Sequence, residues 1–160
     1  GRRPTKQSLT DEIASPPSAD RNDDRIVFMT ASLLFIQLIL GAALRHTGNH
    51  ALAISHIVTG FLVLVHAVLV MLKAFQYSGD QGKLARPAMW LAFLTLIQMS
   101  LGAGSFLHTV MLGKDVSLTA DRIFFVTAHQ SVGALLLALS VFLVFILPAE
   151  RKGSIGTCLP

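Results

Sequence analysis

The chain has 160 residues, of which 52% are hydrophobic and only 14% are charged, and its mean hydropathy is +0.62. These values lie outside the usual balance of a soluble domain and indicate a membrane protein. The net charge of +4 does not indicate nucleic-acid binding, because the basic residues form no continuous face interleaved with aromatic side chains. A single cysteine, Cys158, excludes an internal disulfide or a cysteine-based metal site, and motifs for hydrolysis or phosphoryl transfer are absent.

Four apolar stretches are each long enough to cross a bilayer as a helix, which takes about 20 residues. They cover residues 26–44, 51–72, 88–111 and 123–147. None of them alternates with the period of two that barrel strands require, so we predict an all-α bundle of four transmembrane helices. Pro87 suits the first turn of the third helix, and Pro148 is expected to end the fourth.

Polar segments flank the predicted bundle. Residues 1–24 are polar and contain three prolines, so we expect them to be disordered or extended. Residues 25–148 form the transmembrane domain, and residues 149–160 form a C-terminal tail. Because residues 1–24 bury too little apolar surface to order themselves, we expect them to lie along a neighbouring subunit of a larger membrane complex.

The basic residues are distributed unequally between the two ends of the bundle. With both termini on one side, ten fall on that side and three on the other. The ten are Arg2, Arg3, Lys6, Arg21, Arg25, Lys73, Lys83, Arg86, Arg151 and Lys152, and the three are Arg45, Lys114 and Arg122. The positive-inside rule therefore places both termini in the cytoplasm, or in the matrix, of a bacterial cytoplasmic membrane or a mitochondrial inner membrane.

Two histidines, His56 and His129, lie inside apolar stretches, where an ionisable side chain usually has a partner or a cofactor. Each is followed four residues later by a glycine, Gly60 or Gly133, which leaves a bare helix surface on the same face. Both histidines lie roughly 8–9 Å below the outer boundary of their helices. We predict that they are the axial ligands of one haem and that the glycines make room for it. The alternative is a pair of histidines hydrogen-bonded across the bundle.

The chain also contains an internal repeat. The segment IQLILGA at 36–42 matches IQMSLGA at 97–103, and the second and fourth helices share the pattern His-x-x-x-Gly. We therefore expect two similar helical hairpins related by an axis along the membrane normal. Gln37 and Gln98 are interpreted as hydrogen-bonding between helices, with direct contact to the cofactor as the alternative, while Gly41 and Gly102 allow a close approach.

Other residues near the outer end receive different interpretations. Arg45 is a candidate partner for haem propionates, with headgroup contact as the alternative. His46, His50 and His108 are interpreted as interfacial histidines, although a second haem or metal site there stays open. His66 lies deeper, without a counterpart in the fourth helix, and is interpreted as a packing or hydrogen-bonded residue.

Four segments of the chain resemble a known protein family. They are the string QLILGAALRHTG at 37–48, the helix of His56, the second Gln-x-x-x-Gly and the segment Ala128-His129-Gln130. They resemble the haem A synthase family, specifically the C-terminal four-helix half of its eight-helix members, over about residues 26–147. The resemblance implies that His56 and His129 are the axial ligands of a haem b. It also implies that the chain is a half-size relative, a fragment, or one chain of a homodimer.

Two functions follow from these patterns. The family's substrate-binding half has a glutamate near its first ligand that is implicated in the oxidation, whereas the glutamates here, Glu12 and Glu150, lie outside the predicted spans. We therefore expect a non-catalytic haem b protein, an electron-transfer or anchoring subunit of a membrane complex with a periplasmic redox partner. The alternative is a half-size haem A synthase that oxidises haem O as a homodimer or with a second half. A four-helix protein without haem is the third option.

Overall fold

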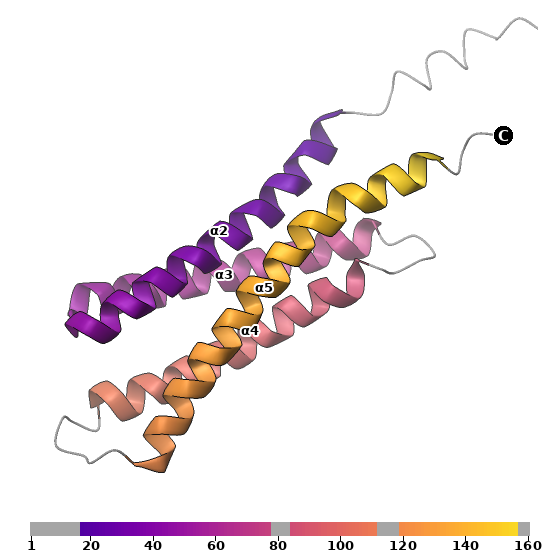
Figure 1. Cartoon of the computed structure of the whole chain (residues 1–160). Helices are drawn as coiled ribbons and strands as arrows, with labels where there is room; N and C mark the ends of the chain where they lie inside the picture. Colours follow the sequence, from indigo (N-terminus) through magenta and orange to yellow (C-terminus); the bar gives the residue numbers. More distant parts are fainter. Residues whose placement is uncertain (1–16, 78–83, 112–118, 157–160) are drawn as a thin grey trace, which may run out of the picture.

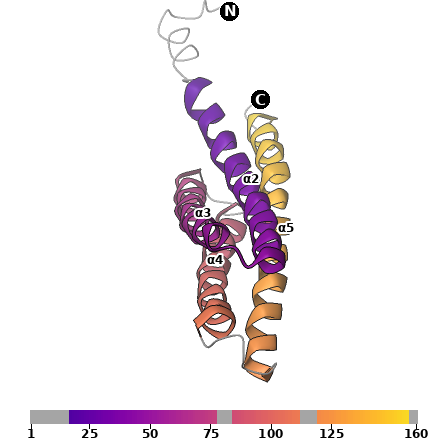
Figure 2. The ribbon, with the colours of Figure 1, turned by 90° about the vertical axis from the view of Figure 1, so that its left-hand side faces the viewer.

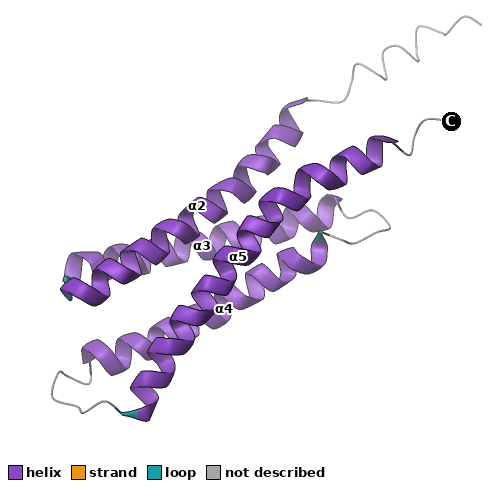
Figure 3. Cartoon of the chain, in the orientation of Figure 1, coloured by secondary structure: helices purple, strands orange, loops and turns teal. Residues whose placement is uncertain are grey.

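The computed structural model describes residues 17–77, 84–111 and 119–156. They form helices α2 (Pro17–Thr47), α3 (His50–Tyr77), α4 (Ala85–Phe106) and α5 (Ala120–Gly156), with a π-helical turn, η1 (Leu107–Met111), after α4 (Figure 1). The described part of the chain contains no strand (Figure 3). All four helices are long and apolar enough to span a membrane, so the predicted all-α transmembrane bundle is confirmed.

The helices run alternately up and down. Each packs against two neighbours, so that α2 and α4 face each other across one diagonal of the bundle and α3 and α5 across the other (Figures 1 and 2). Between α3 and α5, no two described Cα atoms lie within 8 Å. The start of α2 and the end of α5 lie at the same end of the bundle, and α3 and α5 both begin at the opposite end (Figure 1). We call the end where α3 and α5 begin the outer end.

A two-residue turn joins α2 to α3. Gly48 has a φ of +61°, which glycine adopts without strain, and its N–H donates to the carbonyl of Leu44 at 2.8 Å. Asn49 then begins the next helix, because its Oδ1 accepts the N–H of Ala51 at 2.8 Å. The interruption between the first two predicted helices, 26–44 and 51–72, is confirmed, whereas residues 78–83 and 112–118, between the later helices, lie outside the described part of the chain.

The predicted start of the first helix and the predicted end of the fourth helix were both wrong. Helix α5 continues through Pro148 to Gly156, because a proline removes only one backbone donor and the Ala-Glu-Arg-Lys segment after it favours helix. Helix α2 begins at Pro17, so residues 17–24 are helical rather than disordered or extended. A proline fits the first helical position, where its missing N–H would have had no partner. Residues 1–16 lie outside the described part of the chain.

The buried core occupies only the inner half of the bundle, which is the half nearer the termini. Its buried residues fall within 27–34 of α2, 63–74 of α3, 85–95 of α4 and 136–143 of α5. The largest fully buried apolar side chains are those of Leu91, Leu136 and Leu143. Among the described residues of the outer half, none is buried to the same degree. The side chains therefore form a continuous packed core in one half of the membrane span only.

The positive-inside rule makes a testable prediction about which end faces the cytoplasm. In a Cys158→Ser background, we expect His50→Cys at the start of α3 to react with a membrane-impermeant maleimide in intact spheroplasts. Arg86→Cys near the start of α4 should react only after permeabilisation, because basic residues collect at its end. Both positions are exposed. Labelling of Arg86→Cys in intact spheroplasts would contradict the predicted orientation.

Candidate functional site

His56 on α3 and His129 on α5 face each other across the diagonal of the bundle. Their ring centroids are 6.1 Å apart, and the two ring planes make an angle of 77°. Because the backbones of α3 and α5 do not approach each other closely, the two imidazoles reach across the space between them. The prediction that these two histidines lie at one level of the bundle is confirmed.

Each histidine is positioned by a reciprocal contact with the preceding helix. Between α2 and α3, the Nε2 of Gln37 donates to the carbonyl of His56 at 2.8 Å. A Cβ atom on Gly60 would lie 2.9 Å from that Nε2, so any larger residue at position 60 would require the amide to shift. In return, the imidazole of His56 lies against Gly41, where a Cβ would be 3.2 Å from its Cε1.

The second hairpin repeats this arrangement. The Nε2 of Gln98 donates to the carbonyl of His129 at 2.8 Å and lies where a Cβ on Gly133 would be 2.9 Å away. The imidazole of His129 lies against Gly102, where a Cβ would be 2.9 Å from its Cε1. The expected repeat of two hairpins and the interhelical hydrogen bonds of both glutamines are thus confirmed.

The equal spacing of the two motifs produces this geometry. Because paired helices run antiparallel, Gln-x-x-x-Gly and His-x-x-x-Gly face each other with Gln37 opposite Gly60 and Gly41 opposite His56. Each histidine therefore lies against the glycine of the neighbouring helix, and its own following glycine accommodates a glutamine. Sequence reasoning gave Gly60 and Gly133 the role of making room for a haem beside the histidine of the same helix, whereas glutamine side chains lie against them. It gave Gly41 and Gly102 the role of allowing close helix approach and missed that the imidazoles lie against these two glycines. The matched four-residue spacing in both motifs was the available signal.

The site lies at the outer boundary of the packed core. Three buried side-chain atoms in the described residues have no hydrogen-bond partner, and all belong to this layer: Oε1 of Gln37, Nδ1 of His56 and Oε1 of Gln98. Buried polar atoms normally have partners, so their concentration here marks this layer as different from the rest of the bundle. Elsewhere, the hydroxyls of Thr30 and Thr95 donate to carbonyls of their own helices at 2.8 and 2.7 Å.

The remaining membrane histidines lie elsewhere. Nδ1 of His66 lies 2.8 Å from the carbonyl of Leu62, which can only accept, so the expected hydrogen-bonded role is confirmed. His108 is stacked on Phe125 from α5, with ring centroids 5.3 Å apart and an interplanar angle of 17°. His46 and His50 are exposed beside the α2–α3 turn. The described residues contain no group of three or more His, Cys, Asp or Glu side chains that could hold a metal ion.

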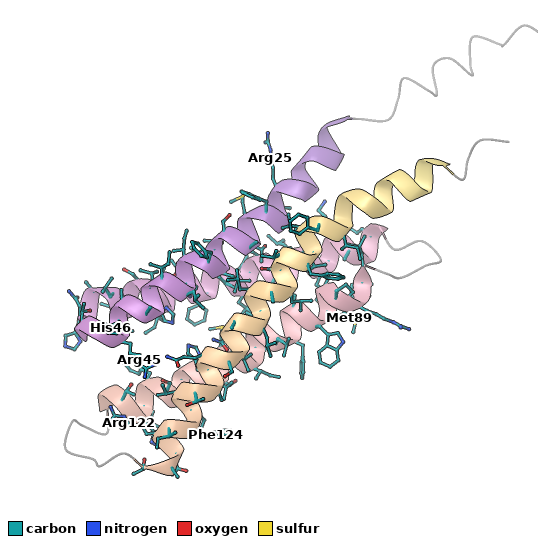
Figure 4. All side chains as sticks on the ribbon, in the orientation of Figure 1. Arg25, Arg45, His46, Met89, Arg122 and Phe124 are labelled. Carbon is teal, nitrogen blue, oxygen red and sulfur yellow. The ribbon has the colours of Figure 1, made fainter. Side chains whose placement is uncertain are left out.

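Two arginines lie at the outer end on different hairpins. Arg45 is exposed near the end of α2, and Arg122 is half-buried near the start of α5. Figure 4 shows Arg45 extending from α2 in the direction of the α4–α5 hairpin, at the same end as Arg122. Sequence reasoning did not include Arg122 with the site, because only the fold shows that it lies at the same end of the bundle as Arg45 (Figure 4).

Comparisons with protein-family models, curated proteins and solved structures find no match. The resemblance to haem A synthases therefore stays a prediction from the motif residues. The function has to be inferred from the geometry of the histidine layer.

The glutamine contacts predict a measurable contribution to stability. Gln37→Leu and Gln98→Leu should each lower the free energy of unfolding by about 0.6–1.7 kcal/mol, because each removes an interhelical hydrogen bond within the membrane span. Reversible unfolding in mixed detergent micelles measures this change. The matched control is Gln130→Leu on an exposed face of α5, for which the expected change is below about 0.5 kcal/mol. If Gln37→Leu and Gln98→Leu lower the free energy of unfolding no more than Gln130→Leu does, the assigned glutamine hydrogen bonds are contradicted.

Proposed function

We propose that the protein is a membrane-embedded haem b protein in which His56 and His129 are the two axial ligands. The distance between their rings carries the proposal. Two imidazoles that bind one metal ion from opposite sides, each with a metal–nitrogen distance of roughly 2 Å, have ring centroids about 6 Å apart. The 6.1 Å separation of the two rings matches this requirement.

The surroundings of the histidines also suit a large, flat, apolar group. The packed core ends at the histidine layer, and the side chains of the outer half are at most half-buried. A porphyrin there would bury apolar surface that the helices do not cover for each other. Its two propionates are anionic, and Arg45 and Arg122 place two cationic side chains at the outer end of the bundle.

The chain's own residues would hold and orient the group. His56 and His129 bind it, Gln37 and Gln98 fix the backbones of those histidines, and the surrounding apolar helices exclude water. When bound, haem supplies an iron that accepts and releases one electron.

Electron transfer or anchoring of a larger assembly is the function that these features support best. None of the four described spans contains a glutamate, so the glutamate that the family resemblance associates with oxidation of haem O has no counterpart within them. We therefore propose a non-catalytic cytochrome subunit of a membrane complex. Because both histidines lie toward the outer end, a redox partner would approach most closely from that side.

The proposal predicts a distinctive absorption spectrum. The purified protein should contain one haem b per chain with a six-coordinate, low-spin spectrum, since imidazoles fill both axial positions. His56→Ala and His129→Ala should each abolish that low-spin spectrum. His66→Ala is the matched control and should keep it, because His66 hydrogen-bonds to its own helix. A low-spin, six-coordinate haem in both ligand variants, or a wild-type protein without haem, would overturn the assignment.

A further inference from the structure

The two hairpins pack tightly against each other only in the inner half of the bundle. Within each hairpin, the reciprocal contacts of glutamine and histidine join the helices at the histidine layer. Between the hairpins, α2 packs against α5 and α3 against α4, and every buried residue of the described chain lies inward of the histidines. Figures 1 and 2 show the hairpins diverging toward the outer end. In the outer half, therefore, no buried side chain fixes one hairpin against the other.

Arg45 and Arg122 lie on opposite sides of one seam between the hairpins. Arg45 belongs to α2 of the first hairpin, and Arg122 belongs to α5 of the second. Arg45 follows Gly41, which contacts the ring of His56, by four residues, and Arg122 precedes His129 by seven. At 1.5 Å per residue, the two arginines start about 6 and 10 Å outward of the histidine layer. Both are therefore within two helical turns of the proposed iron site.

Neither arginine side chain has a partner in the described part of the chain. No ion pair or side-chain hydrogen bond involves either guanidinium there. The internal repeat does not account for them either, because the matching positions in the other hairpin are Phe106 and Asn49. Guanidinium groups bind carboxylates through paired, charge-assisted hydrogen bonds. Two unpaired guanidiniums, one from each hairpin, therefore suit a ligand that carries two carboxylates.

We propose that Arg45 and Arg122 each bind one propionate of the haem, so that haem binding fixes the outer ends of the two hairpins relative to each other. This inference rests on the proposed haem b function. Ligation of the iron joins the hairpins at one level only, that of the histidines. The propionates add a second connection nearer the outer end, where the side chains of the two hairpins provide none. The site thus selects a porphyrin with free carboxylates.

Haem affinity of single variants tests the two contacts. Arg122→Gln should bind haem b at least about tenfold more weakly, because it loses a charge-assisted hydrogen bond from a half-buried side chain. Arg45→Gln should bind about two- to fivefold more weakly, because its side chain is exposed. Arg25→Gln, an exposed position at the inner end of α2, is the matched control and should keep wild-type affinity (Figure 4). Wild-type affinity of Arg45→Gln or Arg122→Gln, as contact with lipid headgroups predicts, would overturn the proposal.

Distance measurements between the hairpins test the structural consequence. In a Cys158→Ser background in nanodiscs, gadolinium spin labels are attached at Ala51→Cys and Ala120→Cys, the exposed starts of α3 and α5. Their distance distribution should be broad without haem and narrow with haem b. The control pair is Met29→Cys and Met89→Cys, exposed positions on the inner halves of the two hairpins. Its distribution should not change, because the packed core already fixes the hairpins there.

Two further samples separate the propionates from the iron. Haem b dimethyl ester lacks both free carboxylates, and the Arg45→Gln, Arg122→Gln double variant lacks both guanidiniums. The ester in the wild-type chain, and haem b in the double variant, should each leave the outer pair broadly distributed. An outer distribution as narrow as that of the wild-type haem b complex in either sample, or no narrowing when the wild-type chain binds haem b, would overturn the inference. A wild-type chain that binds no haem would instead overturn the proposed function itself.

Discussion

The reciprocal contact between Gln-x-x-x-Gly and His-x-x-x-Gly determines how each helical hairpin is put together. Lipid provides little hydrophobic driving force for one helix to associate with another, so close packing at small residues and interhelical hydrogen bonds must specify the register. Here one glutamine amide occupies the surface of a glycine on the next helix, and one imidazole occupies the surface of a glycine on the previous helix. A shift of register would separate both pairs at once, so the same contact that joins the helices also sets the depth and direction of the histidine.

The repetition of this contact makes a site between the hairpins. Each hairpin positions one imidazole, and packing of the two hairpins places the rings 6.1 Å apart on the diagonal between α3 and α5. The inner half of the bundle contains the packed core, because all the buried residues of the described part of the chain lie there. The histidine site lies at the boundary between this core and the outer half of the bundle. In the account proposed above, a haem completes the interior of that half.

Much of this arrangement could be predicted from the sequence, because lipid restricts the choices. Apolar runs of sufficient length have to be helices, and matched positions of His56 and His129 in two such runs place them at one depth. The glycine against which each histidine lies could not be read from one helix, since it depends on how antiparallel neighbours are rotated. The continuation of α5 beyond Pro148 was also missed, because a proline weakens a helix without always ending it.

The central claim is that His56 and His129 bind one haem iron from opposite sides in the orientation that the bundle imposes. Electron paramagnetic resonance of the oxidised protein tests it most directly, because the low-spin ferric signal depends on the angle between the two imidazole planes. An interplanar angle of 77° predicts the strongly anisotropic signal of nearly perpendicular axial imidazoles. The rhombic signal of parallel imidazole planes, or the absence of any low-spin ferric haem, would contradict the account.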